Sequence, residues 1–286
     1  MEPTSDGGSI IVGSSGGVYL LKLDAAGNAQ WEKFMSFWDT MITYCLFGRQ
    51  TADGGYIVTA ERSTASTCVV SLLKMDSVGN VQWERAFSNG IFPHGRSVVQ
   101  TTDGGYLVVG ETAPPPLAPP AFLIKTDASG DLTWRKSYGT SYGADYAYCV
   151  QLTPDGGYVI AGQKDNNAWL FKVNSSGDML WERTYGTGRI YSVRQTTDGG
   201  FILGGFSYFA PYRVRLIKTD ANGNRDWEKT FAGMGEAGAK SVLATADGSY
   251  VVLGWTNTGG TDGGSAYLIK VGQPPAAARP AWRLYR

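Results

Sequence analysis

The tripeptide Asp-Gly-Gly recurs along this chain at a nearly constant interval. It begins at residues 6, 53, 103, 155 and 198, and the variant Asp-Gly-Ser begins at residue 247. The successive spacings are 47, 50, 52, 43 and 49 residues. A period of this length indicates a repeat architecture, so the 286 residues are divided into six similar units.

A second motif, of the type Lys-x-Asp-x-x-Gly-x-x-x-Trp, follows in five of the units. It places each lysine nine residues before a tryptophan, and these residues are Lys22 and Trp31, Lys74 and Trp83, Lys125 and Trp134, Lys172 and Trp181, and Lys218 and Trp227. We expect the tryptophans to be structural residues that wedge between neighbouring repeats. A charged pair such as Glu84-Arg85 follows each tryptophan. Charges of this kind protect an outer strand from pairing with another molecule.

One unit shows how the repeat folds. Alternating, β-branched and apolar segments predict four strands, and the two Gly-containing segments between them predict tight turns. The expected strands are 97–101, 106–110, 122–126 and 132–138, with turns at 103–105 and 127–131. Glycine interrupts every segment that is long enough for a helix. The sequence therefore predicts an all-β fold, a six-bladed β-propeller of four-stranded antiparallel blades.

The two ends of the chain depart from this pattern. Residues 1–5 are too few for a full first strand, and Pro3 suits only an edge position. We expect residues 1–272 to form the six-repeat propeller and residues 273–286 to form a Pro/Ala-rich tail. Trp282 follows Lys270 by twelve residues instead of nine. Either the tail completes the last blade with Trp282 in the usual structural position, which we favour, or it is a linker.

The segments KTDASGDLTW and KTDANGNRDW carry a resemblance to known propellers. They resemble the blades of quinoprotein-like propellers and the Asp-box turn of sialidase-type propellers, with one residue more before the aromatic. The whole unit, DGGYIV…LIKTDxxGNxxWEKTFG, is similar to a repeat family of secreted or surface proteins of bacteria and archaea. The resemblance covers nearly the whole chain. It implies the propeller fold and an extracellular or cell-surface location, although no signal peptide is visible in the sequence.

Composition excludes some classes of function. Lys plus Arg and Asp plus Glu are equal at 25 each, so the chain lacks the basic footprint of a nucleic-acid binder. No apolar run is long enough to span a membrane. The three cysteines show no metal-binding spacing and suggest small buried side chains. No metal site and no cofactor are expected.

The loops between second and third strands, together with the connections between blades, differ from unit to unit. We call the end of the blades that carries them the variable rim. Variable loops on a rigid scaffold are where binding residues concentrate, and aromatic rings beside amides and carboxylates suit a sugar or a protein ligand. The candidate ligand-binding residues are Trp38, His94, Tyr142, Tyr146, Tyr191, Tyr208, Tyr212 and Trp255.

Catalytic patterns are scarce. His94 is the sole histidine, and its neighbours Pro93 and Gly95 place it in a loop. The sequence thus favours a non-enzymatic extracellular or cell-surface binding or assembly module for a glycan or protein partner. Two alternatives stay open: a structural subunit of a surface layer or filament, and a carbohydrate-active hydrolase or lyase. The latter would use rim carboxylates such as Asp39, Asp145, Asp165 and Glu236.

Overall fold

The computed structural model describes most of the chain. The described residues are 1–14, 16–36, 41–63, 68–88, 93–112, 120–139, 145–208, 211–231, 235–245, 247–257 and 265–272, without the side chains of 41–46 and 63. They divide into two compact units, Met1–Gly156 and Gly157–Arg286. Each unit is described by itself below.

All elements of the described part are strands. The first unit contains β1 (Glu2–Pro3), β2 (Ser9–Ser14), β3 (Val18–Leu23), β4 (Ala29–Met35), β5 (Met41–Gln50), β6 (Tyr56–Ser63), β7 (Cys68–Met75), β8 (Val81–Phe87), β9 (Pro93–Gln100), β10 (Tyr106–Thr112), β11 (Ala121–Thr126), β12 (Leu132–Tyr138) and β13 (Tyr146–Leu152). The second contains β14 (Tyr158–Lys164), β15 (Asn167–Val173), β16 (Met179–Thr187), β17 (Arg189–Gln195), β18 (Phe201–Ser207), β19 (Arg213–Thr219), β20 (Arg225–Phe231), β21 (Glu236–Ala244), β22 (Tyr250–Asn257) and β23 (Ser265–Val271).

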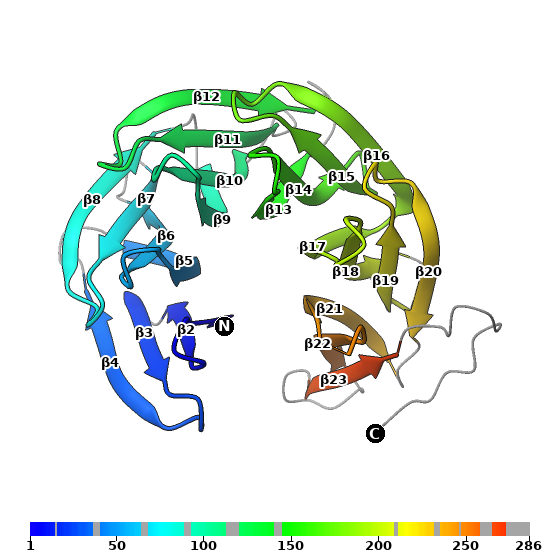
Figure 1. The fold of residues 1–286 in the computed structure, drawn as a ribbon, viewed down its shortest axis with the longest axis horizontal. Coiled ribbons are helices and arrows are strands. Elements are labelled where there is room, and N and C mark those ends of the chain that lie inside the picture. The colour runs from blue at the N-terminus through cyan, green and yellow to red at the C-terminus, as the bar shows by residue number, and fades with distance from the viewer. Residues whose placement is uncertain are drawn as a thin grey trace. The chain divides into compact units, whose positions relative to one another are not determined.

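The strands form antiparallel sheets in chain order (Figure 1). The orders are β1-β2-β3-β4, β5-β6-β7-β8, β9-β10-β11-β12, β13-β14-β15-β16, β17-β18-β19-β20 and, within the described residues, β21-β22-β23. We number these sheets as blades 1 to 6. The predicted fold class, an all-β six-bladed β-propeller, is confirmed.

The N-terminal end of the array is short, as the sequence indicates. The first strand, β1, has two residues, which pair through Glu2 with Ile10 and through Pro3 with Ser9. The tail 273–286, including Trp282, lies outside the described residues.

In blades 1, 2, 3 and 5 a buried lysine holds the turns. In blade 3, Lys125 Nζ lies 2.8 Å from Asp103 Oδ2 and donates to the carbonyl of Thr126 at 2.7 Å. The second glycine of Asp-Gly-Gly makes room for it, because a Cβ on Gly105 would lie 2.7 Å from the same Nζ. The two sequence motifs therefore meet in one contact, and the same ion pair joins Lys22 to Asp6, Lys74 to Asp53 and Lys218 to Asp198.

Neighbouring blades meet through the motif tryptophans. Trp83 of blade 2 lies edge-on to Tyr106 of blade 3, with ring centroids 5.6 Å apart. Gly130, in the last turn of blade 3, lies under the same indole, and its φ of +81° is the left-handed conformation that favours glycine. Equivalent ring contacts join Trp31 to Tyr56, Trp181 to Phe201 and Trp227 to Tyr250.

The charged pair after Trp83, Glu84-Arg85, has two structural roles. The basic member reaches the next blade: Arg85 Nε donates to Asp131 Oδ1 at 3.0 Å, and its guanidinium lies over Trp83. The acidic member stays in its own blade, where Glu84 accepts from Arg62 and from Ser71. The charged pair therefore forms specific bonds, in addition to its expected role of keeping the outer strand from pairing with another molecule.

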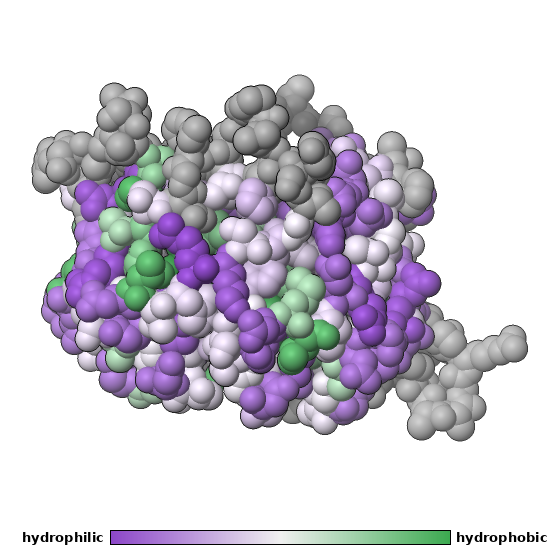
Figure 2. Space-filling view, turned by 90° about the horizontal axis from the view of Figure 1, so that it is seen from above, coloured by the Kyte–Doolittle hydropathy of each residue, from purple (hydrophilic) through white to green (hydrophobic). Residues whose placement is uncertain are grey.

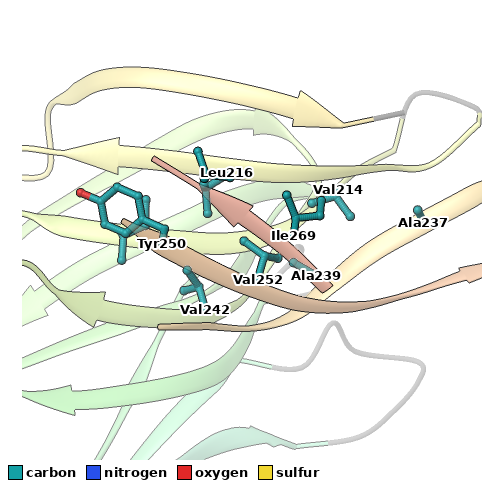
Figure 3. Close-up of a cluster of buried hydrophobic side chains, with 10 residues drawn as sticks. Val214, Leu216, Ala237, Ala239, Val242, Tyr250, Val252 and Ile269 are labelled. Atoms are coloured by element: carbon teal, nitrogen blue, oxygen red, sulfur yellow. The ribbon is translucent and has the colours of Figure 1, made fainter. Parts of the chain in front are cut away.

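Apolar side chains fill the space between adjacent blades. Between blades 5 and 6 the buried cluster includes Leu216, Val242, Tyr250, Val252 and Ile269 (Figure 3). Large exposed hydrophobic residues include Leu132 on β12, the neighbours Met179 and Leu180 on β16, and Leu243, Leu253 and Leu268 on the three described strands of blade 6. Figure 2 shows hydrophilic and hydrophobic residues interspersed on the face that it displays. No helix among the described residues has the length and apolar character needed to cross a membrane.

Candidate functional site

The sixth position of the second strand is occupied by a different kind of residue in almost every blade. Counted from the residue after the Asp-Gly-Gly or Asp-Gly-Ser motif, the strands read SIIVGS, YIVTAE, YLVVGE, YVIAGQ, FILGGF and YVVLGW. This position lies at the end of the strand next to the variable rim. Its occupants are Ser14, Glu61, Glu111, Gln163, Phe206 and Trp255.

In the second unit, aromatic rings gather around Phe206. Its ring centroid lies 5.8 Å from that of Tyr191, 5.4 Å from that of Tyr208 and 5.3 Å from that of Tyr212. Tyr208 and Tyr212 also contact each other, with centroids 6.1 Å apart. Phe206 is buried and the three tyrosines are half-buried, so each tyrosine keeps part of its surface in solvent. We call these four residues the tyrosine cluster.

Polar groups orient the tyrosine cluster. The Tyr208 hydroxyl donates to Gln163 Oε1 at 2.7 Å, and Arg189 Nε donates to the same oxygen. The Arg189 guanidinium lies 5.5 Å from the Tyr208 ring centroid, and Lys240 Nζ lies 4.1 Å from that of Tyr191. A cation over an aromatic face is attracted by the ring quadrupole. The cluster is thus an aromatic surface with positive charge at its border.

Trp255 of blade 6 packs beside this cluster. A Cβ on Gly238 would lie 2.9 Å from Trp255 Nε1 and 3.4 Å from Phe206 Cβ. The glycine therefore lets the indole and the cluster approach each other. Of the predicted ligand-binding residues, the second unit brings Tyr191, Tyr208, Tyr212 and Trp255 to this end of blades 5 and 6.

In the first unit, the sixth position holds two buried carboxylates. Glu61 Oε2 contacts His94 Nδ1, and Glu111 Oε1 accepts from Arg96 Nε at 2.8 Å. The Arg96 guanidinium lies 6.0 Å from the Tyr148 ring centroid. The expectation that His94 lies in a loop is wrong: it belongs to β9, paired in register with Glu111.

The surroundings shift the pKa values of these groups. Burial raises the pKa of Glu111, and the bond from Arg96 offsets this only in part. Burial lowers the pKa of Arg96, but the bond and charge of Glu111 outweigh it, so that the net shift is upward. Burial, and then the charge of Glu61, raise the pKa of the Cys68 thiol to about 12. The thiol therefore stays protonated at neutral pH, as a small buried side chain.

This network of the first unit is mainly structural. Glu111 is 1% exposed, and its Oε2 is buried with no hydrogen-bond partner among the described residues. Tyr146 stacks on Tyr148, with centroids 5.7 Å apart and the planes 5° from parallel. The predicted residues His94 and Tyr146 thus belong to one side of blades 3 and 4, where charges are already paired.

Other sequence candidates are distributed differently. Trp38, Asp39 and Tyr142 lie outside the described residues. Asp145 is fully buried, and a Cβ on Gly139 would lie 2.0 Å from its carboxylate, so it does not face the rim as a free acid. Within the described ranges, no three His, Cys, Asp or Glu side chains are grouped as metal ligands would be.

A pocket of about 640 Å³ opens between blades 4 and 5 of the second unit. Strand ends on the variable rim provide its lining, which includes Asn167, Thr187, Ser207, Arg213, Arg215 and Thr230. The pocket adjoins the tyrosine cluster along the chain, since Tyr208 follows Ser207 and Tyr212 precedes Arg213. Sequence reasoning missed this pocket, together with Gln163, Phe206 and Arg189. Alignment of the six second strands on the Asp-Gly-Gly motif would have singled out Gln163 and Phe206.

Comparison with known proteins supports the fold. No family model matches the sequence, and no curated protein matches it. Among solved structures, the chain is similar to the Dos1 propeller, with 13% identity and a TM-score of 0.56 over 88% of this chain and 63% of that one. It is also similar to the WD40 domain of Neurospora crassa Pan2, with 12% identity and a TM-score of 0.59 over 90% of this chain and 74% of that one.

A third similar structure is puromycin hydrolase, with 13% identity and a TM-score of 0.57. There the match covers 94% of this chain and 44% of that one. The chain therefore spans less than two thirds of both the Dos1 and the puromycin hydrolase chains. These likenesses define the chain as a β-propeller. At such low identity they concern the fold alone.

Proposed function

We propose that this β-propeller is a non-enzymatic binding module that engages a glycan or protein partner through its variable rim. The observation that carries the proposal is the tyrosine cluster of the second unit. Rigid aromatic side chains give a large contact area at low entropic cost, and residues of this type dominate binding energy in recognition surfaces.

The surroundings of the cluster support a binding role. Its three tyrosines are half-buried, so their rings are held in place and keep part of their surface for a ligand. The Arg189 and Lys240 cations at its border provide polar contacts beside the apolar rings. By contrast, the opposite end of the blades consists of repeated turns in which Asp and Asn side chains bond their own backbone, as Asp220 does with Asn224.

The enzyme alternative receives less support from the described residues. Asp145 is buried, and both Glu61 and Glu111 contact basic side chains. A general acid or nucleophile for glycoside cleavage needs two carboxylates that face one bond. The proposal therefore assigns no catalytic residue.

A glycan and protein array screened with the intact chain tests the proposal. The chain is compared with a Tyr208→Ala/Tyr212→Ala variant and with an Asn224→Ala control on the opposite rim. We expect the tyrosine variant to lose about tenfold or more in affinity for any ligand found, because each aromatic anchor contributes ~1–3 kcal/mol. Unchanged binding by the tyrosine variant, with loss in the Asn224 control, would place the site on the other rim and reject the proposal.

We further propose an extracellular or cell-surface location, which rests on the resemblance of the repeats to secreted and surface proteins. Fractionation of the producing cell with an antibody to the chain tests it. Recovery of the full chain from the cell interior alone would reject the location and leave the binding role intact.

A further inference from the structure

We infer that the pocket between blades 4 and 5 binds the carboxylate of an acidic saccharide. The inference rests on the proposed function, because the pocket adjoins the tyrosine cluster, and it deepens that function by naming the ligand class. Four polar groups that have no partner among the described residues carry it: the Arg213 guanidinium and the hydroxyls of Thr187, Ser207 and Thr230.

Arg213 supplies an uncompensated positive charge. It is exposed at the start of β19 and lines the pocket. Among the described residues, no side chain or carbonyl pairs with its guanidinium. A free guanidinium offers a planar fork of donors that matches a carboxylate in two parallel hydrogen bonds.

The second arginine of the pocket has a different role. Arg215 Nε donates to Glu228 Oε1 at 2.7 Å, and its Nη2 donates to Glu228 Oε2 at 3.0 Å and to the carbonyl of Tyr185. Arg225 adds a further ion pair to the same carboxylate. Burial raises the pKa of Glu228, but the bonds from Arg215 outweigh it and the net shift is downward, so the carboxylate stays ionised. Glu228 is thereby neutralised, and the pocket keeps the positive charge of Arg213.

Three hydroxyl groups complete the lining. Thr187, Ser207 and Thr230 come from the ends of β16, β18 and β20. None of these hydroxyls bonds to another group in the described part of the chain, so each can donate and accept. The Asn167 side chain, which donates to the carbonyl of Asp165, lines the same pocket and leaves its carbonyl oxygen as an acceptor. Such a set suits a ligand that carries several hydroxyl groups.

One cation beside several free hydroxyls favours a sugar acid over an acidic peptide. A peptide would present mainly backbone carbonyl and amide groups instead of hydroxyls. A uronate presents one carboxylate and a ring of hydroxyls, and the neighbouring tyrosine faces suit stacking on a pyranose. The volume lies within the range of small-molecule sites.

Calorimetric titration of the full chain provides the test. The probes are tetragalacturonate, its fully methyl-esterified form, a hyaluronan tetrasaccharide and tetraglutamate. We expect at least one of the two acidic saccharides to bind, and to bind more tightly than the ester and the peptide. Rising salt should weaken that binding, because it screens the charge.

Three variants separate the contributions. Arg213→Gln should weaken binding of the acidic saccharide about ten- to hundredfold, the effect of a lost charge-assisted pair, and leave the ester unaffected. Arg213→Lys should lose less, because it keeps the charge without the fork. Arg135→Gln, at another exposed arginine with no partner among the described residues, is the matched control and should bind like the parent chain.

The outcomes are distinct. Equal affinity for tetragalacturonate and its ester, or no binding of either acidic saccharide, overturns the inference. Tighter binding of tetraglutamate replaces the saccharide by an acidic peptide and also overturns it. The Tyr208→Ala/Tyr212→Ala variant separates the two proposals. If it binds the acid normally while Arg213→Gln does not, the pocket stands and the tyrosine cluster is not the binding surface; the reverse result retains the cluster and rejects the pocket.

Discussion

The indole of Trp83 lies edge-on to the ring of Tyr106, with their centroids 5.6 Å apart, and so joins blade 2 to blade 3. Trp83→Ala should remove this contact and leave a cavity beside the core. We expect the free energy of unfolding to fall by about 3 kcal/mol. This value is at the lower end for buried tryptophans because the ring is half-buried. The thermal midpoint should fall by several degrees. Leu132→Ala, at a residue that is 50% exposed, is the control. A shift of under about two degrees for Trp83→Ala would contradict the wedge assignment.

Gly130 and Gly27 occupy the same turn position in blades 3 and 1, with φ of +81° and +86°. A Cβ on Gly130 would lie 2.7 Å from the Trp83 ring, whereas a Cβ on Gly27 meets nothing within 4 Å. Alanine in the left-handed conformation lowers the free energy of unfolding by about 1 kcal/mol in both variants. Only Gly130→Ala must also displace the indole. Urea unfolding should therefore show Gly130→Ala to be clearly less stable than Gly27→Ala. Equal losses of unfolding free energy in the two variants would show that Gly130 is needed only for the turn.

Lys125 and Asp103 form an unequal pair, because the lysine side chain is 4% exposed and the aspartate 64%. Asp103→Asn leaves a buried ammonium without its counter-ion, whereas Lys125→Met leaves a carboxylate that water can reach. We expect Asp103→Asn to lower the free energy of unfolding by about 1 kcal/mol or more beyond the effect of Lys125→Met. This value is modest because the carboxylate is exposed to solvent. Denaturant unfolding of both variants measures the difference. A more harmful Lys125→Met would mean that packing of the lysine stem dominates.

Acid should weaken the same contacts. Burial raises the pKa of Asp53, Asp103 and Asp198, but bonds from the lysine, the threonine hydroxyl and the glycine amide outweigh it and lower the pKa from 3.8 to about 2. The unfolded chain therefore takes up protons first as the pH falls. The stabilisation is complete above about pH 4 and is lost towards about pH 2. The unfolding free energy of the parent chain should fall as the pH is lowered across that range. The difference in unfolding free energy between the parent chain and Asp103→Asn should become smaller. If this difference does not change with pH, Asp103 is not the titrating group.

The side chain of Lys270 in blade 6 is 48% exposed, whereas those of Lys22, Lys74, Lys125 and Lys218 are 4–5% exposed. Leu268, two residues earlier, is 60% exposed. If the tail supplies a fourth strand to blade 6, deletion of residues 279–286 should lower the thermal midpoint and promote aggregation through this apolar edge. Light scattering during a thermal scan checks both effects. A monomeric deletion variant with an unchanged midpoint would identify the tail as a linker.

The sequence was sufficient for the blade count and the strand order, because both motifs recur at fixed spacing and each marks a turn. It did not reveal that Asp103 and Lys125 touch, because a contact across 22 residues depends on how two turns fold together. His94 was misplaced because Pro93 and Gly95 break most strands. Here Pro93 is the first residue of β9, and Gly95 packs so close to Thr59 and Val70 that a Cβ would not fit.

The candidate site was harder to predict, for a physical reason. Its aromatic residues stand out in the sequence, but whether a ring faces solvent or a neighbour depends on packing between blades. Tyr208 and Tyr212 both pack against Phe206, a residue that the sequence did not single out. Arg213 was overlooked because its importance lies in having no partner among the described residues while Arg215, two residues on, is fully paired.

The Lys125–Asp103 ion pair lies within one blade, whereas Trp83 contacts Tyr106 and Gly130 of the blade that follows. A tandem duplication of one repeat, about 48 residues, would therefore bring its own ion pair within the blade and its own tryptophan contact with the next copy. Stability then grows as a sum of single-repeat and nearest-neighbour contributions. Such a chain can change its number of blades by copying genetic units, while rim residues such as Gln163 and Phe206 diverge independently in each copy.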